Sequence, residues 1–211
     1  MIDIALYLPG FFAAYAILLV GASSPGPAVA MLMGIASSQG RTPALITCFG
    51  IAAGSATLNI LTLMGVGLIL SQAAWAMTAL RVVGAAYLAY LAYGAFRKAI
   101  TPPDITAQTV APLSAKAAFA KGYALQVTNP KAIAFWLAIA AVAATDGGGW
   151  VVITAFVLGA ALISFLCHGA WAVFLSSRAV RAAYQKARAS IEGALGAFFA
   201  FAAFKLATTR I

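Results

Sequence analysis

The sequence predicts an all-α, polytopic membrane protein of six transmembrane helices. Of the 211 residues, 64% are hydrophobic and only 8% are charged, whereas a soluble domain carries about 25% charged residues. Apolar runs of about 20 residues recur along the chain, and a helix of this length spans a bilayer. Lipid requires each span to satisfy its own backbone hydrogen bonds, so helices are expected throughout. These observations exclude an ordinary soluble enzyme and a disordered chain.

The net charge of +9 does not indicate a nucleic-acid partner. The basic residues cluster between apolar runs instead of covering one solvated face. Segment 1–10 contains Asp3 and no Lys or Arg, so it lacks the basic start of a signal peptide. The first apolar run is therefore expected to be retained as a span.

One linker is expected between the third and the fourth span. The linker, 97–116, contains Pro102, Pro103 and Pro112, which discourage regular structure. The chain 1–211 is expected to form a single transmembrane domain with two halves, about 10–96 and 117–208. The six expected spans are 10–37, 43–70, 75–96, 117–144, 150–175 and 190–208.

The distribution of basic residues predicts the orientation in the membrane. If the first span starts outside, nine of the 13 Lys and Arg residues lie on the cytoplasmic side and three on the outer side. Cytoplasmic loops carry the excess of Lys and Arg, so both termini are predicted outside. The nine are Arg41, Arg97, Lys98, Lys116, Lys121, Arg178, Arg181, Lys186 and Arg188, and the three are Arg81, Lys205 and Arg210.

The two halves form a candidate inverted repeat. Each half has three spans, and because three is odd the halves must enter the membrane in opposite directions. Weak internal similarity supports this arrangement. Segment 24–30 (SPGPAVA) resembles 129–134 (NPKAIA), and 84–87 (GAAY) resembles 196–199 (GAFF).

Proline interrupts the first and the fourth span near their middles. Pro25 and Pro27 fall in the first span and Pro130 falls in the fourth. Proline removes a backbone donor and costs about 3 kcal/mol in a helix interior, and the freed carbonyls need a partner at membrane depth. Matching breaks in two halves are typical of a transporter's binding site. The alternative is a pair of proline kinks that only shape helix packing.

The breaks can bind both charges of an amino acid. Half-helices start at about Ala28 and Ala132, and their free N–H groups and positive dipole ends can hold a carboxylate. Unwound carbonyls of 23–26 and 128–129 can hold an ammonium group. Polar side chains are expected at the same level from Ser23, Ser24, Gln126, Thr128 and Asn129.

Lys131 is the charged residue that cannot reach a span end. It is the fifteenth residue of the expected span 117–144, and a cation at this depth costs about 3 kcal/mol or more. Its partner is predicted to be a substrate carboxylate, with backbone carbonyls near the break as the structural alternative. The other charged residues of the spans lie near span ends and are expected to snorkel; they are Arg81, Lys121, Glu192 and Lys205.

The single histidine, His168, is a candidate proton carrier because its unperturbed pKa is near 6.5. The alternative for His168 is a packing residue held by hydrogen bonds. Cys48 and Cys167 are the only cysteines and form no CxxC pair. They permit the alternative of a transmembrane thiol relay, although buried cysteine is commonly a small hydrophobe.

Three further features are interpreted as structural. Gly50 and Gly54 form a GxxxG that permits close helix approach, within the monomer or in a homodimer. Tyr87, Tyr90 and Tyr93 repeat every three residues and are expected to form a packing stripe. Segment 176–190 is expected to be either a basic helix on the inner leaflet or a solvated loop.

Several of these residues resemble the LysE/RhtB family of bacterial amino-acid exporters. The resemblance lies in 24–27 (SPGP), 40–44 (GRTPA), 83–88 (VGAAYL) and 121–135, which carries Lys-Gly, Gln, Asn-Pro-Lys and Phe in order. It implies a non-enzymatic, proton-driven exporter in the cytoplasmic (inner) membrane with an amino-acid substrate and no cofactor. The family's proline motifs correspond to Pro25, Gly26, Pro27, Asn129, Pro130 and Lys131. The chain after Leu137 matches less clearly.

Charge considerations favour neutral over basic substrates. The four acidic residues are Asp3, Asp104, Asp146 and Glu192, and none is expected deep in a span. A basic side chain would therefore meet no buried anion, so threonine, homoserine or branched-chain amino acids are predicted. Export of a metal or small ion is the alternative, although one His and two scattered Cys supply few ligands and no metal site is expected.

Overall fold

The fold is all-helical throughout the part of the chain that the computed structural model describes, with no strand there. The described residues are 4–24, 26–72, 75–101, 111–140 and 149–208. A short 3-10 helix, Ile4–Tyr7, precedes the first α-helix. The α-helices are α1 (Leu8–Ser23), α2 (Pro27–Gln39), α3 (Arg41–Gln72), α4 (Trp75–Ile100), α5 (Ala115–Thr128), α6 (Pro130–Ala140), α7 (Gly149–Phe174) and α8 (Arg178–Thr208).

Four of the described segments are long and apolar enough to cross a membrane. They are Ala5–Ser23, Arg41–Gly65, Gly149–Phe174 and Arg178–Thr208. These helices expose many large apolar side chains, such as Leu61, Leu162 and Phe204. An exposed apolar surface of this extent is typical of a protein that contacts lipid. The helices are therefore those of a multi-pass membrane protein.

Both helix interruptions lie where proline occurs in the sequence. The first separates α1 from α2, with Ser24 and Gly26 in extended backbone and Pro27 opening α2. The second separates α5 from α6, where Asn129 is extended and Pro130 opens α6. Proline suits the first helical position, and the residue before it avoids helical angles. Pro25 lies outside the described residues.

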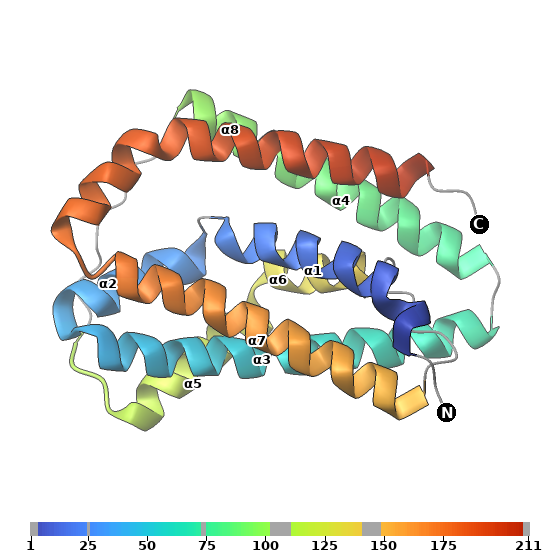
Figure 1. Cartoon of the computed structure of the whole chain (residues 1–211), viewed down its shortest axis with the longest axis horizontal. Coiled ribbons are helices and arrows are strands. Elements are labelled where there is room, and N and C mark those ends of the chain that lie inside the picture. Colours follow the sequence, from blue (N-terminus) through green and yellow to red (C-terminus); the bar gives the residue numbers. More distant parts are fainter. Residues whose placement is uncertain (1–3, 25, 73–74, 102–110, 141–148, 209–211) are drawn as a thin grey trace.

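The helices form two layers (Figure 1). Helices α4 and α8 lie along each other on one side, and the other helices lie together on the opposite side. In the second layer α3 packs against α5 and α7, and α7 packs against α1 and α2. Fully buried Trp136, Phe156 and Phe199 come from α6, α7 and α8. The main core cluster thus connects both layers.

Two glycines of α3 permit its close contact with α5. A Cβ at Gly50 would collide with the backbone of Phe119, and one at Gly54 would lie 2.8 Å from the Cβ of Gln126. On α5, a Cβ at Gly122 would collide with the backbone of Thr47. The Gly50–Gly54 motif therefore serves packing within the chain, one of the two roles expected for it.

Helix α8 is longer than the sequence-based span 190–208. It runs without a break from Arg178 to Thr208, because segment 178–191 contains neither proline nor glycine and is rich in Ala, a strong helix former. Glu192 consequently lies mid-helix and is 0% exposed, and Arg188 is also buried. The expectation that Glu192 snorkels from a span end was wrong, as was the assignment of Arg188 to a solvated loop or to the membrane surface.

Candidate functional site

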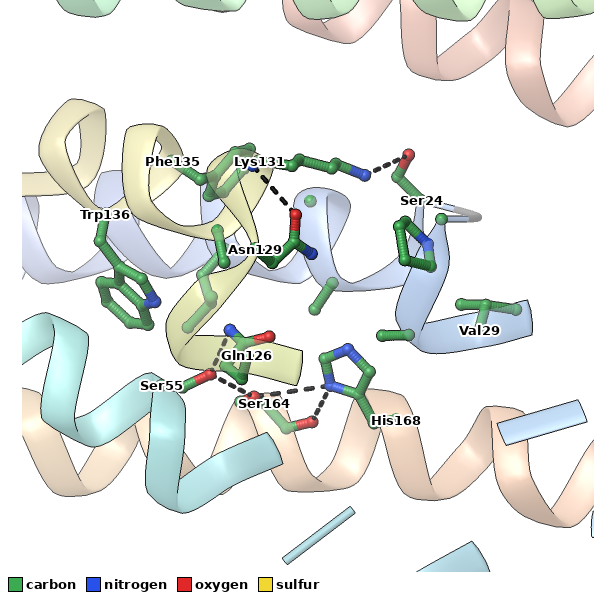
Figure 2. Close-up of a pocket in the computed structure, with 17 residues that line it drawn as sticks. Ser24, Val29, Ser55, Gln126, Asn129, Lys131, Phe135, Trp136, Ser164 and His168 are labelled. Carbon is green, nitrogen blue, oxygen red and sulfur yellow. Dashed lines mark hydrogen bonds between the residues drawn. The ribbon is translucent and has the colours of Figure 1, made fainter. Parts of the chain in front are cut away.

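The two helix interruptions meet at one small cavity. The cavity has a volume of about 60 Å³, which is room for a few water molecules. Both breaks contribute to its wall, and α3 and α7 close it from the other side (Figure 2). The polar and charged lining residues are Ser24, Ser55, Gln126, Asn129, Lys131, Ser164 and His168.

Lys131 links the two breaks. It is the second residue of α6, and its ammonium nitrogen donates to the hydroxyl of Ser24, 3.2 Å away at the end of α1. Its backbone N–H donates to Oδ1 of Asn129 (3.0 Å), and its carbonyl accepts from the hydroxyl of Tyr87 (3.1 Å). The backbone on both sides of the charge is thus fixed by side-chain hydrogen bonds. Among the described residues, no carboxylate forms an ion pair with Lys131.

Two helix N-termini face the cavity. Ala28 and Val29 of α2 and Ala132 of α6 all line it. First-turn N–H groups of a helix have no partner within the helix, and the helix dipole adds partial positive charge at this end. With the Lys131 ammonium group, these termini form a positive site suited to a carboxylate. Gly26 and Pro27 also line the cavity, so the backbone of the first break is accessible to a ligand.

A chain of hydrogen bonds forms the opposite wall of the cavity. The amide nitrogen of Gln126 donates to the Ser55 hydroxyl at 2.8 Å, and this hydroxyl lies 3.0 Å from that of Ser164. His168 Nδ1 lies 2.7 Å from the Ser164 carbonyl, so this nitrogen carries a hydrogen. The Nε2 atom points toward the cavity in Figure 2. His168 is therefore tied to α7 and still presents one ring nitrogen to the site.

A larger cleft adjoins the small cavity. Its volume is about 690 Å³, and it lies between α4 and α8 on one side and the two breaks on the other. Ser24, Gly26, Pro27 and Lys131 line both spaces, so a ligand in the cleft has direct access to the Lys131 ammonium group. The charged residues of the cleft wall are Arg97, Lys98, Lys131 and Glu192, an excess of positive charge.

Two residues that the sequence predicted for the site point elsewhere. Ser23, at the end of α1, lines neither space, and its hydroxyl faces the thiol of Cys167. Thr128 is exposed and its hydroxyl donates to the carbonyl of Ala124 in its own helix. The backbone of Pro130 opens α6. The remaining predicted residues that the structure describes converge on the cavity.

Sequence reasoning missed several residues of the two spaces. Ser55 and Ser164 lie near the middles of the second and fifth expected spans, and a polar residue at mid-span is a signal that could have found them. Tyr90 and Tyr93 are exposed and line the larger cleft, so the expected packing stripe was wrong for these two. Glu192 was missed because its span was expected to begin only two residues before it.

Similarity to known proteins extends over most of the chain. The family model for LysE type translocators matches residues 19–210, which is most of the chain. The chain belongs to the LysE type translocator family. Members of this family are transporters and not enzymes. The matched region includes both helix interruptions, Lys131 and all of α8.

Individual relatives cover most of this LysE type translocator. The threonine efflux protein of Escherichia coli (strain K12) is 28% identical over 188 residues, 86% of this chain and 89% of the relative. The threonine efflux protein of Salmonella typhimurium is 28% identical over 196 residues, 90% of this chain and 93% of the relative. The uncharacterized membrane protein YahN of Escherichia coli is 28% identical over 190 residues, 87% and 82% of the two chains. No solved structure matches the chain.

Proposed function

We propose that this translocator exports neutral amino acids across the cytoplasmic membrane in exchange for protons. The observation that carries this proposal is the position of Lys131, whose ammonium group bridges the two breaks beside two helix N-termini. A partly buried cation without an ion-pair partner is costly. An amino-acid carboxylate bound between Lys131 and the N-termini offsets this cost, so the free energy of burial favours substrate binding.

The proposed architecture is a six-span inverted repeat with both termini outside. The packing of the helices supports it, because α3 of the first half contacts both segments of the second half's broken helix, α5 and α6. Helix α7 of the second half likewise contacts α1 and α2. The equivalent helices also pair with each other, α3 with α7 and α4 with α8. An approximate two-fold relation between the halves accounts for all of these pairings.

Neutral substrates were expected because no buried acid was expected, and the structure changes this reason. Glu192 is a buried acid beside the cleft, so an anion is present after all. Three cations, Arg97, Lys98 and Lys131, share that cleft wall with it. A second positive charge on the substrate would be repelled by this excess. Threonine is the first candidate, because relatives of the chain are named threonine efflux proteins.

The cleft is proposed to face the cytoplasm. Arg97 and Lys98, at the end of α4, lie in its wall and are the first residues of the linker 97–116. Cytoplasmic segments carry the excess of Lys and Arg. The substrate would then enter from the cell interior and bring its carboxylate to Lys131 at the inner end of the cleft.

The structure gives little support to the two alternatives, export of a metal or small ion and a transmembrane thiol relay. Within the described ranges, no three His, Cys, Asp or Glu side chains are grouped closely enough to hold a metal ion. Cys48 is fully buried in one apolar cluster, whereas Cys167 contacts Ser23 at the end of α1. Neither thiol lines the cavity or the cleft.

Efflux from cells loaded with amino acids through dipeptides tests the proposal. Cells would express the wild type, Lys131→Ala or, as a matched control, Lys121→Ala, since Lys121 is an exposed lysine of α5. Wild type and Lys121→Ala are expected to speed threonine efflux. Lys131→Ala is expected to lose about tenfold or more of this rate, because a hydrogen bond to a charged group contributes about 1.5–3 kcal/mol.

Three results would contradict the proposal or its site. Efflux of lysine or arginine in preference to threonine would show that the substrate is basic. No effect of the wild type on any amino acid, with the protein present in the membrane, would remove amino-acid export altogether. Equal activity of Lys131→Ala and Lys121→Ala would remove Lys131 from the binding site.

A further inference from the structure

Glu192 is a fully buried acid that has no role in the carboxylate site at Lys131. It lies at the middle of α8 and is 0% exposed, and it is part of the wall of the larger cleft together with Ser24 and Lys131. Neither of its carboxylate oxygens has a hydrogen-bond partner among the described residues. A buried carboxylate without hydrogen bonds carries a large desolvation cost, so a cationic hydrogen-bond donor at this position would stabilise it.

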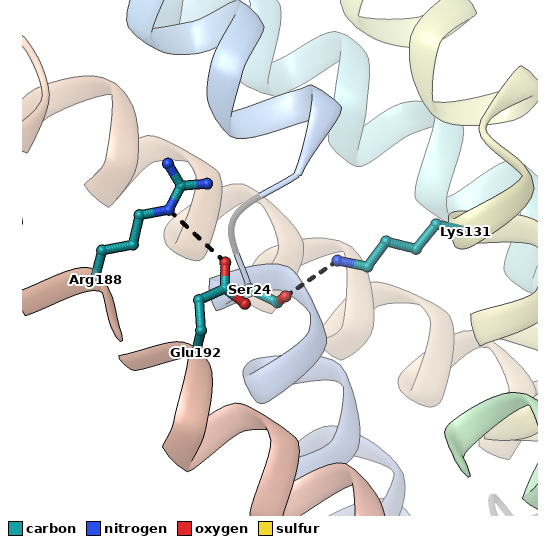
Figure 3. A network of polar contacts seen from close by, with 4 residues as sticks. All are labelled: Ser24, Lys131, Arg188 and Glu192. Carbon is teal, nitrogen blue, oxygen red and sulfur yellow. Dashed lines mark hydrogen bonds and ion pairs between the residues drawn. The ribbon is translucent and has the colours of Figure 1, made fainter. Parts of the chain in front are cut away.

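The positive groups around Glu192 do not satisfy its carboxylate. Nε of Arg188, one turn earlier on α8, forms an ion pair with Oε1 at 3.9 Å, which is longer than the roughly 2.7–2.9 Å of a charge-assisted hydrogen bond. Lys98 of α4 and Lys131 of α6 act on Glu192 only at longer range. Tyr184 of α8 is the other titratable group that interacts with it. Figure 3 shows Glu192 and Lys131 reaching toward Ser24 from α8 and α6.

Glu192 and Lys131 complement the two charges of an amino acid. Lys131 binds the hydroxyl of Ser24, and Ser24 lines the cleft beside Glu192. A zwitterion whose carboxylate lies at Lys131 would direct its ammonium group across the first break toward α8. The Glu192 carboxylate is fully buried, so binding of the ammonium group requires the side chain of Glu192 to become accessible from the cleft.

We propose that Glu192 is the group at which the substrate ammonium and a proton compete, and that this competition couples amino-acid export to proton entry. The inference rests on the proposed function. On the cytoplasmic side, the protonated Glu192 carboxyl releases its proton and the carboxylate binds the substrate ammonium. On the outer side the ammonium group leaves and the carboxylate takes up a proton. One proton therefore enters for each amino acid that leaves.

The sign of the proton movement separates this scheme from a symport. If the substrate acted only by drawing Lys131 away from Glu192, the carboxylate would lose a neighbouring positive charge and take up a proton on binding. Competition at Glu192 requires release instead. It also requires that acid weaken substrate binding, by about tenfold per pH unit where the carboxyl group titrates.

Proton release on binding tests the proposal with the purified full chain in detergent. L-Threonine would be added in weakly buffered solution with a pH-indicator dye, and its affinity would be measured over a series from acid to neutral pH. Wild type is expected to release up to one proton per bound threonine and to lose affinity in acid. Glu192→Gln is expected to bind more weakly, with an affinity independent of pH and with no release.

Two further variants complete the test. His168→Gln changes the histidine that lines the small cavity; its affinity for threonine is expected to fall, but each threonine that binds is expected still to release a proton. Glu192→Asp keeps the carboxyl group and is expected to retain release with a shifted midpoint, which provides a readout if Glu192→Gln does not fold. A monodisperse elution profile in gel filtration would establish folding for each variant.

Three results would overturn the assignment of Glu192. The first is that wild type binds threonine with no proton release or with proton uptake. The second is that folded Glu192→Gln still releases protons. The third is that His168→Gln loses proton release while the midpoint of Glu192→Asp is unshifted. In each of these cases amino-acid binding itself would stand. Absence of threonine binding together with absence of efflux would instead remove the proposed function.

Discussion

Lys131 and Ser24 illustrate how single residues position the site. The hydroxyl of Ser24 accepts a hydrogen bond from the Lys131 ammonium group at 3.2 Å, and this contact joins side chains of the two breaks. Its neighbour Ser23 has the same side chain but faces Cys167 instead. Replacing Ser23 or Ser24 by Ala therefore removes the same hydroxyl group from two neighbouring positions, of which only Ser24 contacts Lys131.

Replacing Ser24 by Ala is expected to weaken threonine binding by about tenfold, since a hydrogen bond to a charged group contributes about 1.5–3 kcal/mol and each 1.4 kcal/mol is a factor of ten. Ser23→Ala is expected to remain within about twofold of wild type. Binding of radiolabelled threonine to purified protein would measure both. Equal affinities for the two variants would show that the Ser24–Lys131 contact is not part of the binding site.

The sequence identified some site residues and missed others for physical reasons. Lys131 was found because a charge in the middle of an apolar run is costly. Ser55 and Ser164 were missed because their importance comes from a contact between α3 and α7, residues far apart in the chain. Ser23 and Thr128 were placed in the site because proximity to a break does not reveal where a side chain points.

At the scale of elements, the breaks and the glycine contacts are local consequences of sequence. Proline determined where α2 and α6 begin, so both interruptions were predictable. The length of α8 was not, because hydropathy locates apolar surface and α8 continues through the basic, Ala-rich segment 178–191. Packing against other helices buries Arg188 in that segment and Glu192 next to it, and the hydropathy of one span does not reveal such packing.

Substituting Gly50 by Ala is expected to destabilise the protein, because the added methyl group would collide with the backbone of Phe119 on α5. Overpacking of this kind costs about 1–3 kcal/mol. Gly65→Ala is the matched control on the same helix, since a Cβ there meets nothing within 4 Å. Thermal unfolding in detergent should show a lower midpoint for Gly50→Ala only. An unchanged midpoint would mean that α3 and α5 do not pack this closely.

At the scale of the whole molecule, the arrangement of two layers leaves the cleft between the α4–α8 pair and the helices that carry the breaks. The first and fourth expected spans each divide into two helices. Composition and basic clusters predicted the membrane class and an orientation. They contain no information on which side of the molecule is open, because that depends on how far the two layers separate.

A cysteine in the cleft tests its orientation. In a chain with Cys48→Ser and Cys167→Ser, Tyr93→Cys is expected to react with a membrane-impermeant maleimide from the cytoplasmic face, since Tyr93 is exposed and lines the cleft. Trp150→Cys, at the start of α7, is expected to react from the outer face. Inside-out and right-side-out vesicles provide the two faces. The reverse labelling pattern would mean that the cleft opens outward.

The two breaks and Lys131 are proposed to bind the carboxylate of an amino acid. The most direct measurement compares the binding of L-threonine with that of L-threoninol, which has a hydroxyl group in place of the carboxylate, to the purified wild-type protein. Threoninol is expected to bind about tenfold or more weakly, because it leaves the Lys131 charge without an anion. Equal affinity for the two compounds would contradict carboxylate recognition at this site.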